Sequence, residues 1–169
     1  LACKNVFSYI RFIPDVIHVH DWQVSMLPCV VREDKHDDNP LKNTKFVLTI
    51  HNPAFQGMLD PYNVSDLYGL PSYLYENGTL RFKDSFSTLK AGIVYADKIT
   101  TVSPTHRQEL LSLEESMGLD GVLNLRNEDF VGIVNGLDIN EFNPSKDPYL
   151  YENYNGVSFL KGKAKNKEG

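Results

Sequence analysis

Short apolar runs recur along the chain, and stretches with helical spacing separate them. Four runs rich in β-branched or aromatic residues predict strands that are apolar on both faces. These runs are Val16–His20, Lys45–Ile50, Lys98–Val102 and Phe130–Val134. Strands of this kind, separated by helical segments, are typical of a parallel sheet. The pattern therefore predicts an α/β fold, a Rossmann-like parallel sheet with flanking helices.

Apolar residues spaced three or four positions apart predict the helices between the strands. The expected helices are Leu1–Phe12, Trp22–Glu33, Ser85–Asp97, Pro104–Glu115 and Gly118–Arg126. Ser103 before Pro104 is typical of a helix N-cap followed by proline at the first helical position. The segment Asn63–Thr79 is expected to be irregular because glycine and proline interrupt it.

Composition narrows the classes of function. The 169 residues contain 17 Lys+Arg and 22 Asp+Glu, a formal net charge of −5, which argues against a binder of the nucleic-acid backbone. No apolar run approaches the roughly 18 residues of a membrane span. The two cysteines, Cys3 and Cys29, are too few for a disulfide framework or a four-thiolate zinc site. Both are interpreted as small buried side chains in a reducing compartment.

The candidate chemistry lies just after the strands, because open parallel sheets bind ligands beyond the carboxyl ends of their strands. Polar clusters follow all four strands: His20-Asp21-Trp22, His51-Asn52-Pro53, Ser103-Pro104-Thr105 and Asn135-Gly136-Leu137-Asp138. Their convergence predicts a site at this edge of the sheet. The sequence contains no glycine-rich dinucleotide or phosphate loop and no Gly-x-Ser-x-Gly elbow, so it supports neither a dinucleotide cofactor nor a serine hydrolase.

Several of these residues have a structural interpretation beside the functional one. Asp21 is expected either to accept hydrogen bonds from sugar hydroxyls or to cap the helix that begins at Trp22. Trp22 either stacks on a sugar ring or packs in the core. His51 either packs its loop or donates a hydrogen bond to a substrate hydroxyl or a leaving group. Lys90, on an otherwise apolar helix, is expected to be a solvated surface lysine.

A metal-dependent hydrolase is an alternative function. His18 and His20 point to the same face of their strand, and with Asp21 and His51 they offer imidazole and carboxylate groups that suit zinc. Such a hydrolase needs further ligands from later strands, and nothing after those strands completes the set. On the other interpretation, His18 is a hydrogen-bonded core histidine and only His20 lies near a site.

Five segments taken together are more specific than any single motif. They are PDVIHVHDWQVSMLP (14–28), TKFVLTIHNPAFQG (44–57), TLKAGIVYADKITTVSPTHRQEL (88–110), GLDGVLNLRNEDFVGIVNGLDINEFNPSKD (118–147) and KGKAKNK (161–167). In this order they resemble the bacterial glycogen synthase and plant starch synthase family, glycosyltransferase family 5. The resemblance covers nearly the whole chain between residues 14 and 167.

The resemblance implies a retaining glucosyltransferase with two facing Rossmann-like domains, the GT-B fold. Such enzymes transfer glucose from ADP-glucose, or sometimes UDP-glucose, to the non-reducing end of an α-1,4-glucan in glycogen or starch synthesis. Residues 1–148 match the later part of the N-terminal, acceptor-side domain, and residues 149–169 are expected to be a linker toward the C-terminal, donor-binding domain. The chain is therefore interpreted as a fragment of the N-terminal catalytic domain, inactive on its own.

The same resemblance implies a metal-independent enzyme without a cofactor. It implies a location in the cytoplasm, or in the plastid if the protein comes from a plant. Neither a nucleic acid nor a membrane is expected as a partner. A non-catalytic glucan-binding module is the remaining alternative function.

Carried over residue by residue, the resemblance implies catalytic roles for His51 and Asp21. It implies substrate contacts for Trp22, Asn52, Gln56, Gly57, Asn135 and Asp138, and no metal ligands. Three positions depart from the residue that is common in the family: Phe55 stands in place of tyrosine, Leu137 of isoleucine and Phe142 of tryptophan. These departures are mild and leave the resemblance intact.

Overall fold

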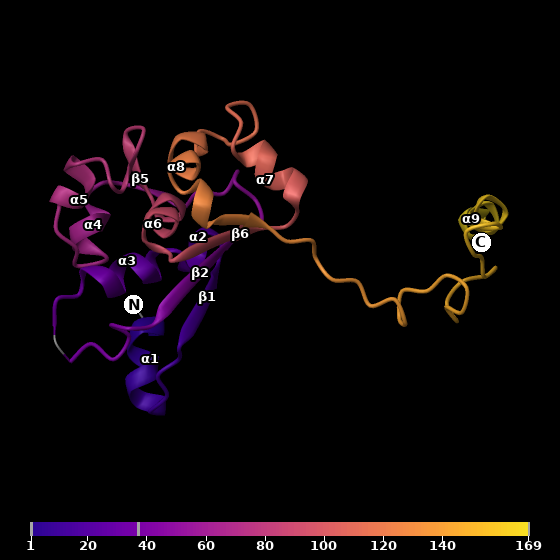
Figure 1. The fold of residues 1–169 in the computed structure, drawn as a ribbon, viewed down its shortest axis with the longest axis horizontal. Helices are drawn as coiled ribbons and strands as arrows, with labels where there is room; N and C mark the ends of the chain where they lie inside the picture. Colours follow the sequence, from indigo (N-terminus) through magenta and orange to yellow (C-terminus); the bar gives the residue numbers. More distant parts are fainter. Residues whose placement is uncertain (1, 37, 169) are drawn as a thin grey trace. The chain divides into compact units, whose positions relative to one another are not determined.

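Two units make up the protein in a computed structural model that describes residues 2–36 and 38–168, apart from the side chains of Cys3 and Ser8. The first unit is Leu1–Val134 and the second is Asn135–Gly169 (Figure 1). The interpretation of Cys3 as a buried side chain lies outside the described side chains.

A four-stranded parallel sheet forms the centre of the first unit, with its strands in the order β1-β2-β6-β7. The strands are β1 (Val16–His20), β2 (Lys45–Ile50), β6 (Lys98–Thr101) and β7 (Phe130–Gly132). All three pairings are parallel. The α/β prediction is confirmed, the first two strands have the expected bounds, and the last two end one and two residues early.

Helices connect the strands and precede the first of them. The α-helices of the described chain are α1 (Ala2–Ile10), α2 (Asp21–Val24), α3 (Met26–Glu33), α4 (Asn63–Asp66), α5 (Tyr73–Glu76), α6 (Thr88–Tyr95), α7 (Pro104–Leu110), α8 (Asp120–Leu125) and α9 (Phe159–Glu168), with a 3-10 turn at Asn127–Asp129. The predicted start of α7 is confirmed: Ser103 Oγ accepts the His106 N–H at 2.9 Å, and Pro104 opens the helix. The segment expected to be irregular holds the one-turn helices α4 and α5.

The single helix expected over 22–33 is in fact two helices, α2 and α3, that meet at Ser25. The Ser25 hydroxyl lies 3.0 Å from the carbonyl oxygen of Trp22 and 2.6 Å from that of Thr88. Serine hydroxyls compete with helical hydrogen bonds in this way. The break therefore depends on a residue far away in the sequence, which helical spacing cannot reveal.

A second, antiparallel sheet was not predicted. Its strands β3 (Met58–Leu59), β5 (Ser85–Ser87) and β4 (Arg81–Phe82) lie in the order β3-β5-β4. The helix start expected at Ser85 is therefore wrong, because α6 begins only at Thr88. Ser87 caps α6 by accepting the Lys90 N–H at 3.1 Å. Strands of two or three residues are too short to show an alternating pattern.

Helices cover one face of the parallel sheet, which we call the covered face (Figure 1). It presents Phe46, Leu48 and Ile99, all of them 0% exposed. Leu89 of α6 and Leu123 of α8 belong to the same buried cluster. Removing this apolar surface from water is the main stabilising contribution to the unit.

The opposite face, which we call the open face, is largely polar and partly accessible within the described part of the first unit, with Thr49 buried in its middle. It carries Val16, His18, His20, Lys45, Val47, Thr49, Lys98, Thr100 and Val131. Val16 is 53% exposed and Val131 is 51% exposed. The expectation that every strand is apolar on both faces is therefore wrong. Residues alternate between faces along a strand, and only one face received an apolar partner.

A second apolar cluster joins α3 and α6 to the small sheet and to α4 and α5. Cys29 lies in it, 0% exposed, and burial raises the pKa of its thiol to about 12. Its interpretation as a small buried side chain is confirmed. Lys90 contradicts its prediction, because its Nζ donates to the carbonyl oxygens of Gly78 at 2.7 Å and Arg81 at 2.6 Å. Burial and the charge of Arg81 lower the pKa of Lys90.

The second unit contains contacts of its own. Glu152 pairs with Lys165 of α9 at 2.9 Å, and Asn166 donates to the carbonyl oxygen of Glu152 at 2.7 Å. The segment expected to be a linker, residues 149–169, therefore includes a helix. The assignment of residues 1–148 to one domain of a larger enzyme stays a prediction. Within the described ranges, no helix has the length and apolar character needed to cross a membrane.

Candidate functional site

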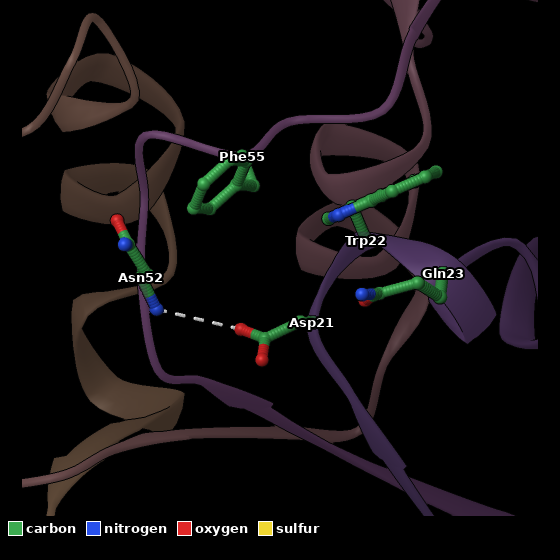
Figure 2. A pocket seen from close by; sticks show the side chains of 5 residues that line it. All are labelled: Asp21, Trp22, Gln23, Asn52 and Phe55. Carbon is green, nitrogen blue, oxygen red and sulfur yellow. Dashed lines mark hydrogen bonds between the residues drawn. The ribbon is translucent and has the colours of Figure 1, made fainter.

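A pocket of about 270 Å³ lies where β1 and β2 end. One side, the α2 wall, consists of Asp21, Trp22 and Gln23, which directly follow β1. The other side, the loop wall, consists of Asn52 and Phe55, from the loop that follows β2. Figure 2 shows the two aromatic rings and the Asp21 carboxylate around the same space. The prediction that polar clusters converge at this edge holds for the first two strands.

Parallel pairing explains why the two walls are neighbours. His20 lies opposite Thr49 in the sheet, so both strands end at the same level. The chain turns away at Asp21, whose φ of 53° is a left-handed conformation that aspartate tolerates better than most residues. This turn carries the Asp21 side chain across to the start of the loop.

The Asp21 carboxylate binds the loop instead of capping its own helix. Its Oδ1 accepts the N–H of His51 at 2.8 Å and the N–H of Asn52 at 3.4 Å. The N-terminal position of α2 is occupied by His20, which makes no side-chain capping bond. The capping interpretation of Asp21 is therefore wrong. Within the described residues, Asp21 Oδ2 has no hydrogen-bond partner, and Asp21 is one of the residues that line the pocket.

Three histidines line up beside this junction. His20 Nδ1 lies 3.0 Å from His51 Nε2, and His18 Nε2 lies 2.6 Å from Thr49 Oγ1. Burial lowers the pKa of His18, and the nearby His20 and His51 lower it further. His18 is hydrogen-bonded, as one interpretation expected, but it lies on the open face and not in the core.

The metal-hydrolase interpretation finds no support in this geometry. Among the described residues, no three His, Cys, Asp or Glu side chains are arranged to hold a metal ion. Two of the four proposed ligands already have other partners: His18 bonds to Thr49, and Asp21 Oδ1 bonds to the loop N–H groups.

The core-packing interpretation of Trp22 is confirmed in part, and its stacking on a sugar ring stays a prediction. The indole is partly buried against the main core cluster, and it also lines the pocket. Gln23 and Phe55 line the pocket as well, although neither was among the predicted site residues. Phe55 is 60% exposed, so most of its ring is accessible to a ligand. One indication in the sequence that Phe55 belongs to the site was its place three positions after Asn52.

Three predicted site residues of the loop are not among the residues that line this pocket: His51, Gln56 and Gly57. His51 lies beside Asn52, which does line it. Gln56 is 8% exposed, and its Nε2 donates to the carbonyl oxygens of Pro53 and Met117, each at 3.1 Å. Gly57 has a φ of 60°, and a Cβ there would overlap Thr88 Oγ1. Gln56 and Gly57 shape the loop, and their predicted substrate contacts stay predictions.

Asn135 and Asp138 belong to the second unit, and their expected place at a cleft stays a prediction. The Glu141 and Asn140 N–H groups donate to Asp138 Oδ1 at 3.1 and 2.8 Å, and they lower the pKa of its carboxyl group. The polar cluster after β6 has a local structural role, because Ser103 caps α7.

Comparison with known proteins gives a consistent result. Residues 1–125 match the family model described as the starch synthase catalytic domain. A glycogen synthase of Streptococcus mutans is 40% identical over 167 residues, and one of Streptococcus gordonii is 42% identical over 167 residues. Both alignments cover 99% of this chain. The chain spans about 35% of the length of these curated relatives.

A solved structure is similar over the same extent. The catalytic domain of starch synthase IV from Arabidopsis thaliana, bound to ADP and acarbose, superposes with a TM-score of 0.78 at 30% sequence identity. The superposition covers 99% of this chain and 34% of that chain. The fold and the sequence therefore point to the same relatives.

Proposed function

The chain belongs to the starch synthase catalytic-domain family, and from this premise we propose that it forms the acceptor-side part of a retaining glucosyltransferase. The whole enzyme would have the two-domain GT-B fold. It would transfer glucose from ADP-glucose, or from UDP-glucose, to the non-reducing end of an α-1,4-glucan in glycogen or starch synthesis. Residues 1–148 would form part of the acceptor-side domain, and residues 149–169 would lead to the donor-binding domain.

The single observation that carries this proposal is the pocket between the α2 wall and the loop wall. A pyranose ring has an apolar C–H face and a rim of hydroxyl groups. The pocket offers two aromatic rings, Trp22 and Phe55, for the face, and a carboxylate and two amides for the hydroxyls (Figure 2). Apolar walls with a few placed polar groups are typical of small-molecule sites.

Asp21 is proposed to accept a hydrogen bond from a sugar hydroxyl. Its Oδ1 is held by the loop N–H groups, so the carboxylate is already oriented before a ligand arrives. Its Oδ2 has no partner within the described residues and is the oxygen that would receive the hydroxyl. Preorganised charged groups of this kind contribute more than mobile ones.

His51 is proposed to donate a hydrogen bond to the transferred glucose or to its leaving group. Its Nε2 is engaged with His20 Nδ1, which leaves Nδ1 of His51 for a substrate. If His20 donates in this pair, His51 carries its own proton on Nδ1 and presents a donor. A partner on one ring nitrogen fixes the tautomer in this way.

Glucosyl transfer proceeds through an oxocarbenium-like transition state while negative charge develops on the diphosphate leaving group. The pocket residues include one carboxylate and no lysine or arginine, so they suit the sugar better than the phosphate. We infer that cationic contacts to the donor come from other parts of the whole enzyme. The 169-residue chain alone is therefore expected to be inactive.

The names and ligands of the relatives support the proposed partners. The compared glycogen synthases point to glycogen as the product, and the compared starch synthase was solved with ADP bound. We propose a nucleotide-sugar donor and an α-glucan acceptor, with no nucleic acid, membrane, metal or cofactor involved. Likeness to bacterial glycogen synthases supports a cytoplasmic location, and a plant source would place the protein in the plastid.

The test is transfer of radiolabelled glucose from ADP-glucose or UDP-glucose to glycogen by the whole gene product that contains this chain. We expect activity in the unsubstituted protein and a loss of roughly 100-fold or more in His51→Ala, as for other removed transition-state hydrogen bonds. His36→Ala, which removes an exposed histidine outside the pocket, is the matched control and should keep full activity.

Absence of transfer from both donors would refute the glucosyltransferase proposal. Saturable binding of a maltooligosaccharide by that inactive protein would then favour the non-catalytic glucan-binding module.

A further inference from the structure

The N-terminus of α6 lies behind the pocket and contacts both of its walls. The first N–H groups of a helix have no partner within the helix and need acceptors from elsewhere. Here the loop that follows β2 supplies two acceptors. The Thr88 N–H donates to the carbonyl oxygen of Gly57, and the Leu89 N–H donates to that of Gln56, both at 3.2 Å. The Ser87 hydroxyl also donates to the Gln56 carbonyl oxygen, at 2.8 Å. The loop is thereby fixed to the helix directly after Phe55, the last residue of the loop wall.

The same helix end holds the α2 wall. The Thr88 Oγ1 donates to the carbonyl oxygen of Trp22 at 2.8 Å, and the Thr88 carbonyl oxygen accepts the Ser25 hydroxyl at 2.6 Å. Thr88 is 2% exposed and Ser25 is 0% exposed. Hydrogen bonds in such dry surroundings are costly to break, because the groups left behind cannot reach water.

Thr88 thus bonds both to Trp22 of the α2 wall and to the loop that carries the loop wall. Its backbone N–H reaches Gly57, and its hydroxyl reaches Trp22. The three residues are packed tightly, because a Cβ on Gly57 would overlap Thr88 Oγ1 and come within 2.8 Å of Trp22 Cε3. Trp22 is therefore held at its distance from the loop by two connections: this threonine, and the Asp21 carboxylate, which accepts two N–H groups of the loop.

We propose that Thr88 is a positioning residue that sets the distance between the two walls of the pocket, and so the fit of a sugar ring between Trp22 and Phe55. The identity of the ligand rests on the proposed function, whereas the effect on Trp22 does not. The Thr88 hydroxyl donates to a backbone carbonyl oxygen and does not line the pocket, so it acts through Trp22.

The chain offers a direct probe, because Trp22 is its only tryptophan. In the 169-residue chain, acrylamide quenching of tryptophan fluorescence measures how tightly the α2 wall is held. Thr88→Val keeps the shape of the side chain and removes the hydroxyl, and we expect it to increase quenching. Thr88→Ser keeps the hydroxyl and is expected to restore quenching to that of the unsubstituted chain.

Thr44→Val is the matched control. Thr44 is also 2% exposed, and its hydroxyl also donates to a backbone carbonyl oxygen at 2.8 Å, that of Pro14, but it does not touch the pocket. It should lose comparable stability in urea unfolding without any change in Trp22 quenching. An equal rise of quenching in Thr44→Val would overturn the proposal, because it would show general loosening.

Equal quenching in folded Thr88→Val and in the unsubstituted chain would also overturn it. If Thr88→Val does not fold, Thr88→Ala decides in the same way, since it also removes the hydroxyl that donates to the Trp22 carbonyl oxygen. Unchanged quenching in that variant would contradict the proposal.

A titration with maltotetraose, followed by Trp22 emission, tests the consequence for the ligand. We expect Thr88→Val to weaken binding about tenfold, equivalent to about 1.4 kcal/mol, and Thr88→Ser to restore it. If the unsubstituted chain does not respond to maltotetraose, the sugar-binding role of this pocket in the chain is refuted. The quenching comparison still decides whether Thr88 positions the α2 wall.

Discussion

The covered face and the open face of the parallel sheet are built from the same four strands, yet they differ in almost every property. Phe46 and Leu48 on the covered face are 0% exposed. On the open face, His18, Thr49 and Thr100 form a hydrogen-bonded row. Thr49 Oγ1 lies 2.6 Å from His18 Nε2 and 2.6 Å from Thr100 Oγ1. One face holds the unit together through apolar burial, and the other holds polar groups in place through hydrogen bonds.

The difference between the two faces explains where this fold can place the polar residues of a site. The pocket lies at the carboxyl ends of β1 and β2, beside the polar row and above the apolar cluster. His20 and His51 extend the open face to the edge of the sheet. Trp22 packs against the cluster that fills the covered face. The site therefore combines a rigid apolar support with polar groups that would be costly inside it.

The largest expected effect comes from deleting a ring on the covered face. Phe46→Ala should lower the free energy of unfolding by about 3–5 kcal/mol, because the buried ring leaves a cavity. Val131→Ala on the open face should cost about 0.5 kcal/mol. Urea unfolding followed by Trp22 fluorescence measures both. Similar costs for the two variants would mean that the open face is buried in solution.

A second pair of variants tests how closely the helices of the covered face pack. A Cβ on Gly92 of α6 would lie 2.6 Å from Ser25 Cβ and 3.0 Å from the Ser25 carbonyl oxygen. Gly92→Ala should therefore lower the free energy of unfolding by about 1–3 kcal/mol, although alanine favours helices. Gly121→Ala in α8, where a Cβ meets nothing within 4 Å, should raise it by about 0.5 kcal/mol.

A gain of stability in Gly92→Ala would contradict this packing. Gly92→Ala and Gly121→Ala can be compared directly, because both substitutions add a methyl group to a helix and only the neighbouring atoms differ.

The smallest effect concerns pH and the open face. Burial, with the charges of His20 and His51, lowers the pKa of His18 below its ordinary 6.5. Below that pH the unfolded chain binds the proton more readily than the folded chain, so acidification should destabilise the protein. His18→Gln should make the fall in unfolding free energy between pH 7 and pH 5 shallower. The change should be smaller than the preceding ones, because the ring is exposed and solvent screens its charge.

An equal pH slope in His18→Gln and in the unsubstituted chain would assign the acid sensitivity to other groups. Urea unfolding at several pH values is the measurement, and His36→Gln, an exposed histidine outside the sheet, is the control.

Much of the architecture follows from local patterns. β1 and β2 have the bounds that their apolar runs predict, and α7 begins at the predicted serine and proline. These signals involve residues within a few positions of each other. The site was partly predictable for the same reason: Asp21 and Trp22 directly follow β1, Asn52 lies two positions after β2, and all three line the pocket.

Other features depend on residues that are distant in the sequence. Ser25 breaks the expected helix and also bonds to Thr88, 63 positions away. Lys90 was predicted to be solvated, yet it bonds to carbonyl oxygens of a sheet that no pattern showed. Phe55 joins the pocket because Gly57 and α6 fix the direction of its loop.

The sequence by itself determined the four parallel strands, the helices that connect them in outline, the parallel α/β class and the place of the polar clusters after the strands. Alternation along a strand, helical spacing and capping are local properties of the chain, so they can be read without a fold. Only the tertiary structure decided which face of the sheet is covered, which histidines meet, and which threonine lies between the two walls of the pocket. Those choices depend on which partners remain available once apolar surfaces have been buried and backbone groups have been hydrogen-bonded.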